Sequence, residues 1–191
     1  MSRAVRDKWR RKEWYDIILP RYFGETKVGE TPSDDREKVM GRVFETTLAS
    51  ITGDFSQEYI KMYFQVNEIE DHTARTVFKG HEYLRDYLRS LVQRRSTKVD
   101  GFFNINTVDG YRVKIVVTAM TTTRIQTSKE HDIRNIMKEV VQEKSETLSY
   151  DQLAHEMVLG KLASDVYNQA RKVTDLRHVG VRKSELLSLP Q

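Results

Sequence analysis

The chain has 191 residues, of which 38% are hydrophobic and 31% charged, and its formal net charge is +4. This length suffices for one sizeable core, and the ordered apolar patterns exclude a chain that is disordered through most of its length. The absence of cysteine excludes disulfides and thiol catalysis, and no apolar run reaches the ~20 residues of a membrane span. We expect a soluble intracellular protein without membrane contact.

Residues 1–12 form a basic arm. Six cationic side chains oppose only Asp7, so the arm carries about +5 and the remainder of the chain about −1. Such an arm is typical of a protein that binds a polyanion. Its candidate RNA-binding residues are Arg3, Arg6, Lys8, Trp9, Arg10, Arg11 and Lys12. For Trp9, stacking on a base and packing against protein are equally good interpretations, whereas Trp14 is expected to pack in the core.

The next part of the chain, residues 13–122, is expected to be mainly β. Four strands are predicted at residues 13–19, 41–48, 59–71 and 73–79, the last two as a hairpin. Residues 21–32 contain two glycines and Pro32 and are expected to form a loop. Apolar residues at i, i+3, i+4, i+7 and i+8 from Leu84 predict a helix over 82–95. Asp109-Gly110 predicts a hairpin between strands at 98–107 and 111–122.

The last part of the chain is expected to be helical over 123–171, with a final strand at 176–187. One helix is predicted over 127–145, and a second begins near Leu153 and is broken at Gly160. Strands early and helices late favour an α+β class, with a largely antiparallel, barrel-like sheet and helices against one end. We therefore expect residues 13–191 to form a single α+β domain.

No constellation of residues indicates catalysis. The five histidines are scattered, without metal-ligand spacing, so no metal, cofactor or enzymatic activity is expected. The paired carboxylates Asp34 and Asp35 are better explained by a capping turn after Ser33 than by acid–base chemistry.

Two basic clusters lie beyond the arm. The first comprises Arg85, Arg89, Arg94, Arg95 and Lys98, and the second comprises Arg171, Lys172, Arg177, Arg182 and Lys183. Cations at a helix C-terminus are favoured by the helix dipole alone, and for the first cluster this interpretation and phosphate contact are equally good. We retain both clusters as candidate RNA contacts.

Short segments in a fixed order carry a resemblance to a known family. They are KEWYD at 12–16, GRVFE at 41–45, TGDF at 52–55, FQV at 64–66, FKGH at 78–81, DYLRSLV at 86–92, DGY at 109–111, QTS at 126–128, IRNIM at 133–137 and GK at 160–161. From about Lys8 to Lys183 the chain resembles the archaeal and eukaryotic small-subunit ribosomal proteins called S-three-A-e, or e-S-one. Its compact length is similar to that of archaeal members. Asp175 departs from the family, which usually has proline before the corresponding Leu176.

The resemblance implies a structural protein of the cytoplasmic ribosome with a β-barrel-like core and packed helices. It implies a place on the small-subunit platform, near the mRNA exit and the 3′ end of the small-subunit rRNA, in one copy per ribosome. The implied partners are that rRNA and neighbouring ribosomal proteins, with mRNA nearby, and no cofactor or catalysis is implied. Two alternatives are a free-standing RNA-binding translation regulator and an enzyme of nucleic-acid metabolism whose site is not visible in the sequence.

Overall fold

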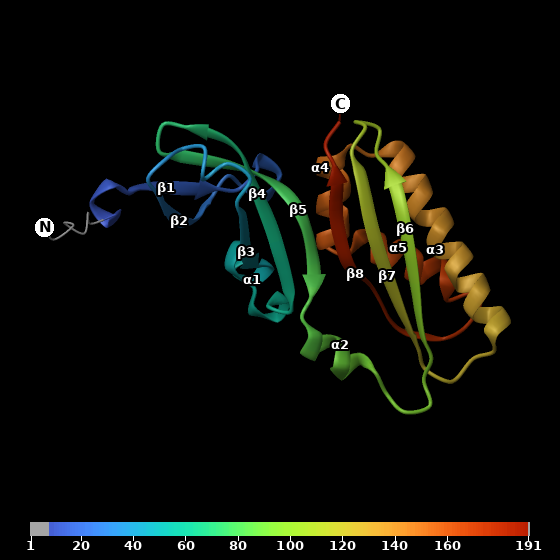
Figure 1. Cartoon of the computed structure of the whole chain (residues 1–191). Coiled ribbons are helices and arrows are strands. Elements are labelled where there is room, and N and C mark those ends of the chain that lie inside the picture. Colours follow the sequence, from blue (N-terminus) through green and yellow to red (C-terminus); the bar gives the residue numbers. More distant parts are fainter. Residues whose placement is uncertain (1–7, 191) are drawn as a thin grey trace, which may run out of the picture. The chain divides into compact units, whose positions relative to one another are not determined.

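The computed structural model describes residues 8–190, and these contain eight strands, five α-helices and three short 3-10 helices (Figure 1). Contacts between Cα atoms group the chain into two compact units. The first unit takes the described part of 1–46 together with 63–78, and the second takes 47–62 and the described part of 79–191. That residues 13–191 fold as one domain stays a prediction. Arg3 and Arg6 of the arm lie outside the described residues.

The first unit is built on short strands around a small aromatic and aliphatic core. Its elements are η1 (Lys8–Arg11), β1 (Glu13–Ile18), η2 (Arg21–Phe23), β2 (Lys27–Ser33), β3 (Val43–Thr47), and parts of β4 (Ile60–Glu70) and β5 (Thr73–Tyr83). β1 pairs antiparallel with β2 and parallel with β5. Because side chains alternate along a strand, Tyr15 and Ile17 of β1 both point inward, where they join Val66 and Ala74 in the core.

β2 is a strand where the sequence predicts a loop. Gly29 and Pro32 suggested a turn-rich segment, yet both lie within the pairing of β2 with β1. β2 is at one end of the strand order, and within the described part of the chain its one partner strand is β1. Proline lacks an N–H, and an edge strand tolerates it because one side of the strand has no partner. The expected loop over 21–32 is therefore wrong for residues 27–32.

The second unit is a sheet covered by helices. Its elements are α1 (Leu48–Thr52), η3 (Phe55–Gln57), α2 (Arg85–Leu91), β6 (Lys98–Asn106), β7 (Arg112–Thr121), α3 (Thr127–Thr147), α4 (Tyr150–Val158), α5 (Lys161–Ala170), β8 (Leu176–Ser188), the start of β4 and the end of β5. The strand order is β5-β8-β7-β6, and all three pairs are antiparallel. Figure 1 shows α3, α4 and α5 on one face of the β6–β7–β8 layer.

The helices begin and end at residues that the sequence marks. Ser149 forms a capping box with Gln152 at the start of α4, and Gly160, with φ of +83°, separates α4 from α5. The predicted break at Gly160 is confirmed. On α3 the apolar stripe that includes Ile133, Met137 and Val141 is buried, as its helical spacing predicts.

The helix α2 is shorter than the helix that the apolar stripe predicts. Gly80, His81 and Glu82 pair with β8, so β5 continues to Tyr83 and the helix begins only at Arg85. The prediction of a helix over 82–95 is therefore wrong at both ends. The ring of Tyr87 on α2 stacks on Tyr59 with centroids 3.8 Å apart, which fixes the short helix.

The α+β class, the largely antiparallel sheet and the helical C-terminal part are confirmed. The eight strands found in residues 8–190 form an open sheet and do not close into a barrel. No helix in that range is long and apolar enough to cross a membrane.

Candidate nucleic-acid interface

The described end of the arm presents an aromatic ring together with a cation. Trp9 in η1 is 62% exposed, and the Lys12 ammonium lies 3.8 Å from its ring centroid. This cation–π contact leaves the ring exposed, in the manner of a stacking platform with an adjacent positive charge. Arg11 is also exposed. The expectation that Trp14 packs in the core is wrong, because its side chain on β1 is 56% exposed.

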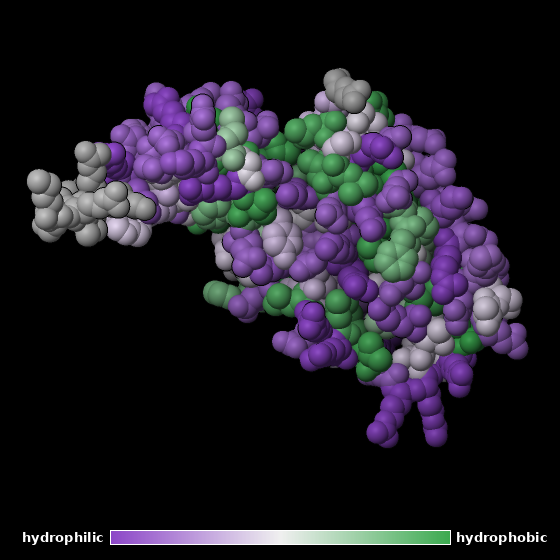
Figure 2. Space-filling view, in the orientation of Figure 1, coloured by the Kyte–Doolittle hydropathy of each residue, from purple (hydrophilic) through white to green (hydrophobic). Residues whose placement is uncertain are grey.

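The first basic cluster is divided between a helix and a turn. Arg85 and Arg89 are exposed on α2, and Arg89 lies 3.9 Å from Asp86. Arg94 and Arg95 lie beyond the end of α2, in the turn before β6, where Arg95 has a left-handed φ of +62°. They therefore do not close the helix, and the helix dipole does not explain them. The space-filling view shows hydrophilic side chains projecting from the tip formed by this α2–β6 connection (Figure 2).

A basic pocket lies beside this turn. It has a volume of about 960 Å³, and its lining residues are Arg95, Ser96, Thr97, Lys98, Thr122, Thr123, Arg124, Ile125, Thr127 and Glu130. Arg95 and Lys98 come from the α2–β6 turn and the start of β6, whereas Arg124 comes from the β7–α3 connection. Three cations thus converge with a group of hydroxyls, which are the side chains that contact phosphate oxygens.

The pocket is held by hydrogen bonds between its two chain segments. Thr121 Oγ1 accepts the Thr97 N–H at 2.9 Å and donates to the Thr123 carbonyl at 2.6 Å. The Ile125 N–H donates to Thr97 Oγ1 at 3.2 Å. These bonds fix the segment that carries Arg124 against the start of β6. Thr127, another lining residue, is the first residue of the 21-residue α3, whose N-terminal dipole favours an anion there.

The charges around the pocket leave a positive excess. Glu130 pairs with Arg134 at 3.2 Å, and Asp100 Oδ2 lies 2.8 Å from Lys98 Nζ and 3.6 Å from Arg182 Nη1. With Arg95 and Arg124 these groups comprise five cations and two carboxylates, an excess of three. Asp100 also brings the two predicted clusters together, because Lys98 belongs to the first and Arg182 to the second.

The rest of the second cluster does not form one surface. Arg171 and Lys172 are exposed just after α5, and Lys183 lies 3.4 Å from Glu82. The Arg177 guanidinium nitrogens Nη1 and Nη2 are buried without a hydrogen-bond partner among the described residues. Burial, reinforced by the positive charge of Arg177, lowers the pKa of the neighbouring His178.

Sequence reasoning missed Arg124. It is isolated in the sequence from both basic clusters, and only the pairing of β6 with β7 brings it beside Lys98. The signal that could have found it is the predicted hairpin, since residues just before 98 and just after 121 must lie at the same end of the two strands.

Residues 8–190 contain no group of three or more histidine or acidic side chains placed to hold a metal ion. Asp34 and Asp35 both pair with Lys38, at 2.8 and 2.6 Å, and the Lys38 ammonium lowers the pKa of Asp34. The expected capping turn is wrong in detail, because the Ser33 hydroxyl donates to the Asp35 carbonyl instead of accepting from an amide. The site is thus a set of cationic surfaces on an α+β framework, which defines a candidate polyanion-binding protein.

Comparison with known proteins gives the family. The model of the Ribosomal S3Ae family matches residues 1–190. The chain is 47% identical over 187 residues to small ribosomal subunit protein eS1 of Staphylothermus marinus. The aligned residues cover 98% of this chain and 88% of that protein. It is 47% identical over 191 residues to eS1 of Aeropyrum pernix, covering 98% and 89%, and 41% identical over 188 residues to eS1 of Saccharolobus solfataricus, covering 98% and 90%.

The chain belongs to the Ribosomal S3Ae family. The resemblance identified from its short segments is confirmed, and the three relatives named above are archaeal. Membership of a ribosomal protein family agrees with the expectation that the chain is not an enzyme.

Proposed function

We propose that this chain is a structural constituent of the small subunit of the cytoplasmic ribosome, where it binds small-subunit rRNA. Its membership of the Ribosomal S3Ae family supports this role, since the relatives are named small ribosomal subunit proteins. The proposal extends to a place on the platform near the mRNA exit, one copy per ribosome, and direct contact with neighbouring ribosomal proteins. No catalytic step is part of it.

The observation that carries the RNA contact is the convergence of Arg95, Lys98 and Arg124 in one pocket. Each segment of an RNA backbone brings closely spaced negative charges, and folded rRNA needs cations where its strands approach one another. A pocket lined by three cations and one carboxylate, with several hydroxyls and a helix N-terminus, fits a phosphate group of such a strand. Arg85 and Arg89 on α2 are further exposed cations in this part of the sequence.

The arm adds a second contact of a different kind. Residues 1–12 carry about +5, and the exposed Trp9 ring offers a face on which an RNA base stacks. The body after the arm is nearly neutral, so we infer that it contacts proteins as well as RNA. In this arrangement the protein neutralises phosphates and fixes the local geometry of the rRNA.

Sedimentation of cell extract at high salt tests the proposed function. A stable constituent of the small subunit is expected to co-sediment with small subunits after a high-salt wash. A chain found only in the soluble fraction would contradict the proposal and favour a free-standing RNA-binding regulator.

A further inference from the structure

One edge of the sheet in the second unit is open. β6 is at the end of the strand order and, among residues 8–190, pairs with β7 alone. The Thr107 N–H donates to the Tyr111 carbonyl at 2.9 Å, and the Thr121 N–H donates to the Thr97 carbonyl at 3.0 Å. In an antiparallel ladder such bonded pairs alternate, so the odd-numbered residues of β6 direct their backbone groups to β7. The even-numbered residues therefore direct theirs to the open edge.

The free part of this edge is short and well defined. Arg134 of α3 donates a hydrogen bond to the Asp100 carbonyl at 3.3 Å, so this outward carbonyl in the first half of β6 already has a partner. The hairpin turn begins after Asn106. Between these limits lie Phe102, Asn104 and Asn106, whose outward N–H and C=O groups have no bonding partner in the part of the chain that the structure describes. They form a repeating row of donors and acceptors.

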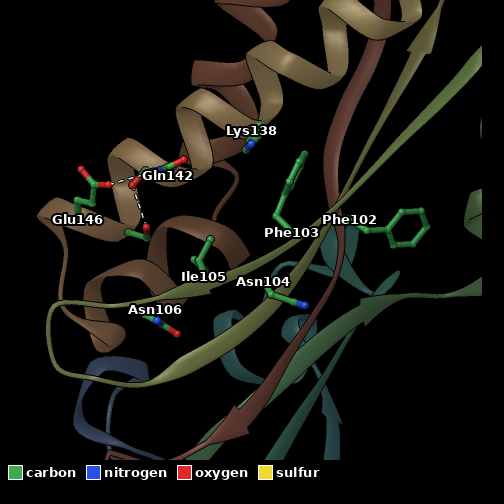
Figure 3. A pocket seen from close by; sticks show the side chains of 9 residues that line it. Phe102, Phe103, Asn104, Ile105, Asn106, Lys138, Gln142 and Glu146 are labelled. Carbon is green, nitrogen blue, oxygen red and sulfur yellow. Dashed lines mark hydrogen bonds between the residues drawn. The ribbon is translucent and has the colours of Figure 1, made fainter.

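A groove runs beside this row. It has a volume of about 610 Å³ and lies between β6 and α3. In Figure 3 the side chains of Phe103 and Ile105 point from β6 toward α3, where Lys138, Gln142 and Glu146 line the other wall. Phe102 points away from the groove and is 64% exposed. A strand placed along β6 would put alternate side chains into this groove.

We propose that this edge binds an extended segment of a neighbouring ribosomal protein, which adds to the sheet as a strand of about five residues beside Phe102–Asn106. The inference rests on the proposed function, since the small subunit supplies the neighbour. Side chains of the bound segment alternate between the two faces of the sheet. Those that enter the groove are apolar and cover Phe103 and Ile105, apart from at least one basic side chain that faces α3.

The chemistry of the edge selects this occupant. A polypeptide strand offers alternating N–H and C=O groups, whereas RNA phosphates only accept hydrogen bonds and leave the outward carbonyls of Phe102 and Asn104 unsatisfied. The charged side chains that line the groove are Lys138 and Glu146, and a basic side chain of the added segment placed beside Glu146 would pair with its carboxylate. The proposed function places one copy of this chain in each ribosome, so a second copy is not the neighbour there.

Hydrogen exchange at single amides tests the inference, in the free chain and in purified small subunits. The amides of Phe102, Asn104 and Asn106 are expected to exchange at least about tenfold more slowly in the subunit. Those of Phe103 and Ile105, already bonded to β7, serve as internal controls that are protected in both states. Unchanged exchange at the three outward amides overturns the inference.

A photo-crosslink identifies the occupant. With p-benzoylphenylalanine in place of Phe102, the expected product in small subunits joins this chain to another protein. A crosslink only to rRNA, only to a second copy of this chain, or to nothing overturns the inference.

A matched pair of variants tests the backbone contact. Asn104→Pro removes one outward N–H without removing a bond to β7, whereas Asn104→Ala keeps that N–H. Both variants are first checked for the thermal unfolding transition of the parent chain. The crosslink is expected to be lost in Asn104→Pro and retained in Asn104→Ala, and retention in both overturns the inference. If Asn104→Pro does not fold, the exchange pattern decides alone.

A parent chain that does not co-sediment contradicts the proposed function and this inference together, whereas co-sedimentation with unprotected edge amides contradicts only this inference.

Discussion

The Ser184 hydroxyl lies 2.7 Å from Nδ1 of His81, and both side chains are buried. The Val181 carbonyl, 3.0 Å from Nε2, can only accept a hydrogen bond, so Nε2 carries the proton and Nδ1 accepts from Ser184. The Ser184 hydroxyl oxygen in turn accepts a hydrogen bond from the backbone N–H of His81 at 3.1 Å. This network joins β5 to β8, and burial favours the neutral imidazole within it.

The stability of the protein is therefore expected to depend on His81 in mild acid. Burial lowers the pKa of His81 from 6.5 to about 4. Between these values the unfolded chain binds a proton that the folded chain does not, so stability is fully present above pH 6.5 and falls as the pH drops toward 4. The loss is expected to reach about 3 kcal/mol. Urea unfolding of the isolated chain at a series of pH values measures it.

The control for this prediction is His81→Gln. This variant has no imidazole at position 81, so the pH dependence between 6.5 and 5 is expected to be shallower even if the variant is less stable overall. Burial lowers the pKa of His178 as well, and that group leaves a residual slope. Equal slopes in the parent and the variant would assign the acid sensitivity to other groups.

Gly80 is expected to tolerate no side chain. A Cβ at this position would lie 2.1 Å from the Ser184 carbonyl oxygen, and the Gly80 φ is +153°. Gly80→Ala must therefore displace β8 backbone, with an expected loss of about 3 kcal/mol in the free energy of unfolding. Gly53→Ala is the matched control, because Gly53 also has a positive φ but no atom within 4 Å of the added Cβ. Its expected loss is about 1 kcal/mol, from backbone strain alone, and similar losses in both variants would contradict the steric argument.

Removing a cation from the basic pocket is expected to weaken rRNA binding in a salt-dependent manner. Arg124→Gln removes one phosphate contact, which should reduce the slope of log K against log salt by roughly one unit. Filter binding of the isolated chain to a small-subunit rRNA fragment at several salt concentrations measures the slope. Lys114→Gln, an exposed cation on β7 outside the pocket, should leave the slope unchanged. A slope unaffected by Arg124→Gln would place the pocket away from RNA.

Deletion of residues 2–12 is expected to separate assembly from folding. The core of the first unit begins with Tyr15, so the shortened chain should keep the circular dichroism spectrum of the parent. Its incorporation into small subunits should be weaker, because about +5 of charge and the Trp9 ring are lost. Competition between labelled parent and deleted chains during reconstitution measures this, and equal incorporation would refute the role of the arm.

Local patterns predicted the elements better than their partners. The alternation over 59–71, the Asp109-Gly110 turn and the break at Gly160 each depend on neighbouring residues, and β4, the β6–β7 hairpin and the α4–α5 junction follow them. β2 was missed because whether Pro32 is tolerated depends on β2 being an edge strand, which is a property of the assembled sheet. The end of β5 was missed for the same kind of reason, since its pairing with β8 joins residues about a hundred positions apart.

The candidate site was predictable in composition and less so in geometry. The clusters at Arg85–Lys98 and Arg171–Lys183 could be read from the sequence, but not that Lys98 and Arg182 share Asp100. Nor could the sequence distinguish the exposed Arg171 from Arg177, whose guanidinium nitrogens are buried. The shared contact with Asp100 depends on the strand register, because a shift by one residue moves every side chain to the other face. The burial of Arg177 depends on its place in β8, whereas Arg171 lies in the turn after α5.

β8 comes after the seven other strands in the sequence, yet it lies between β5 and β7 in the sheet of the second unit. During synthesis β7 can pair with β6 as soon as the hairpin has emerged, but its other edge stays open until Leu176–Ser188 has been made. The nascent chain therefore carries an unfinished sheet through the translation of α3, α4 and α5. If the chain binds rRNA as proposed, we expect the N-terminal arm to make the first contacts, because the sheet of the second unit is completed only after α5 has been made.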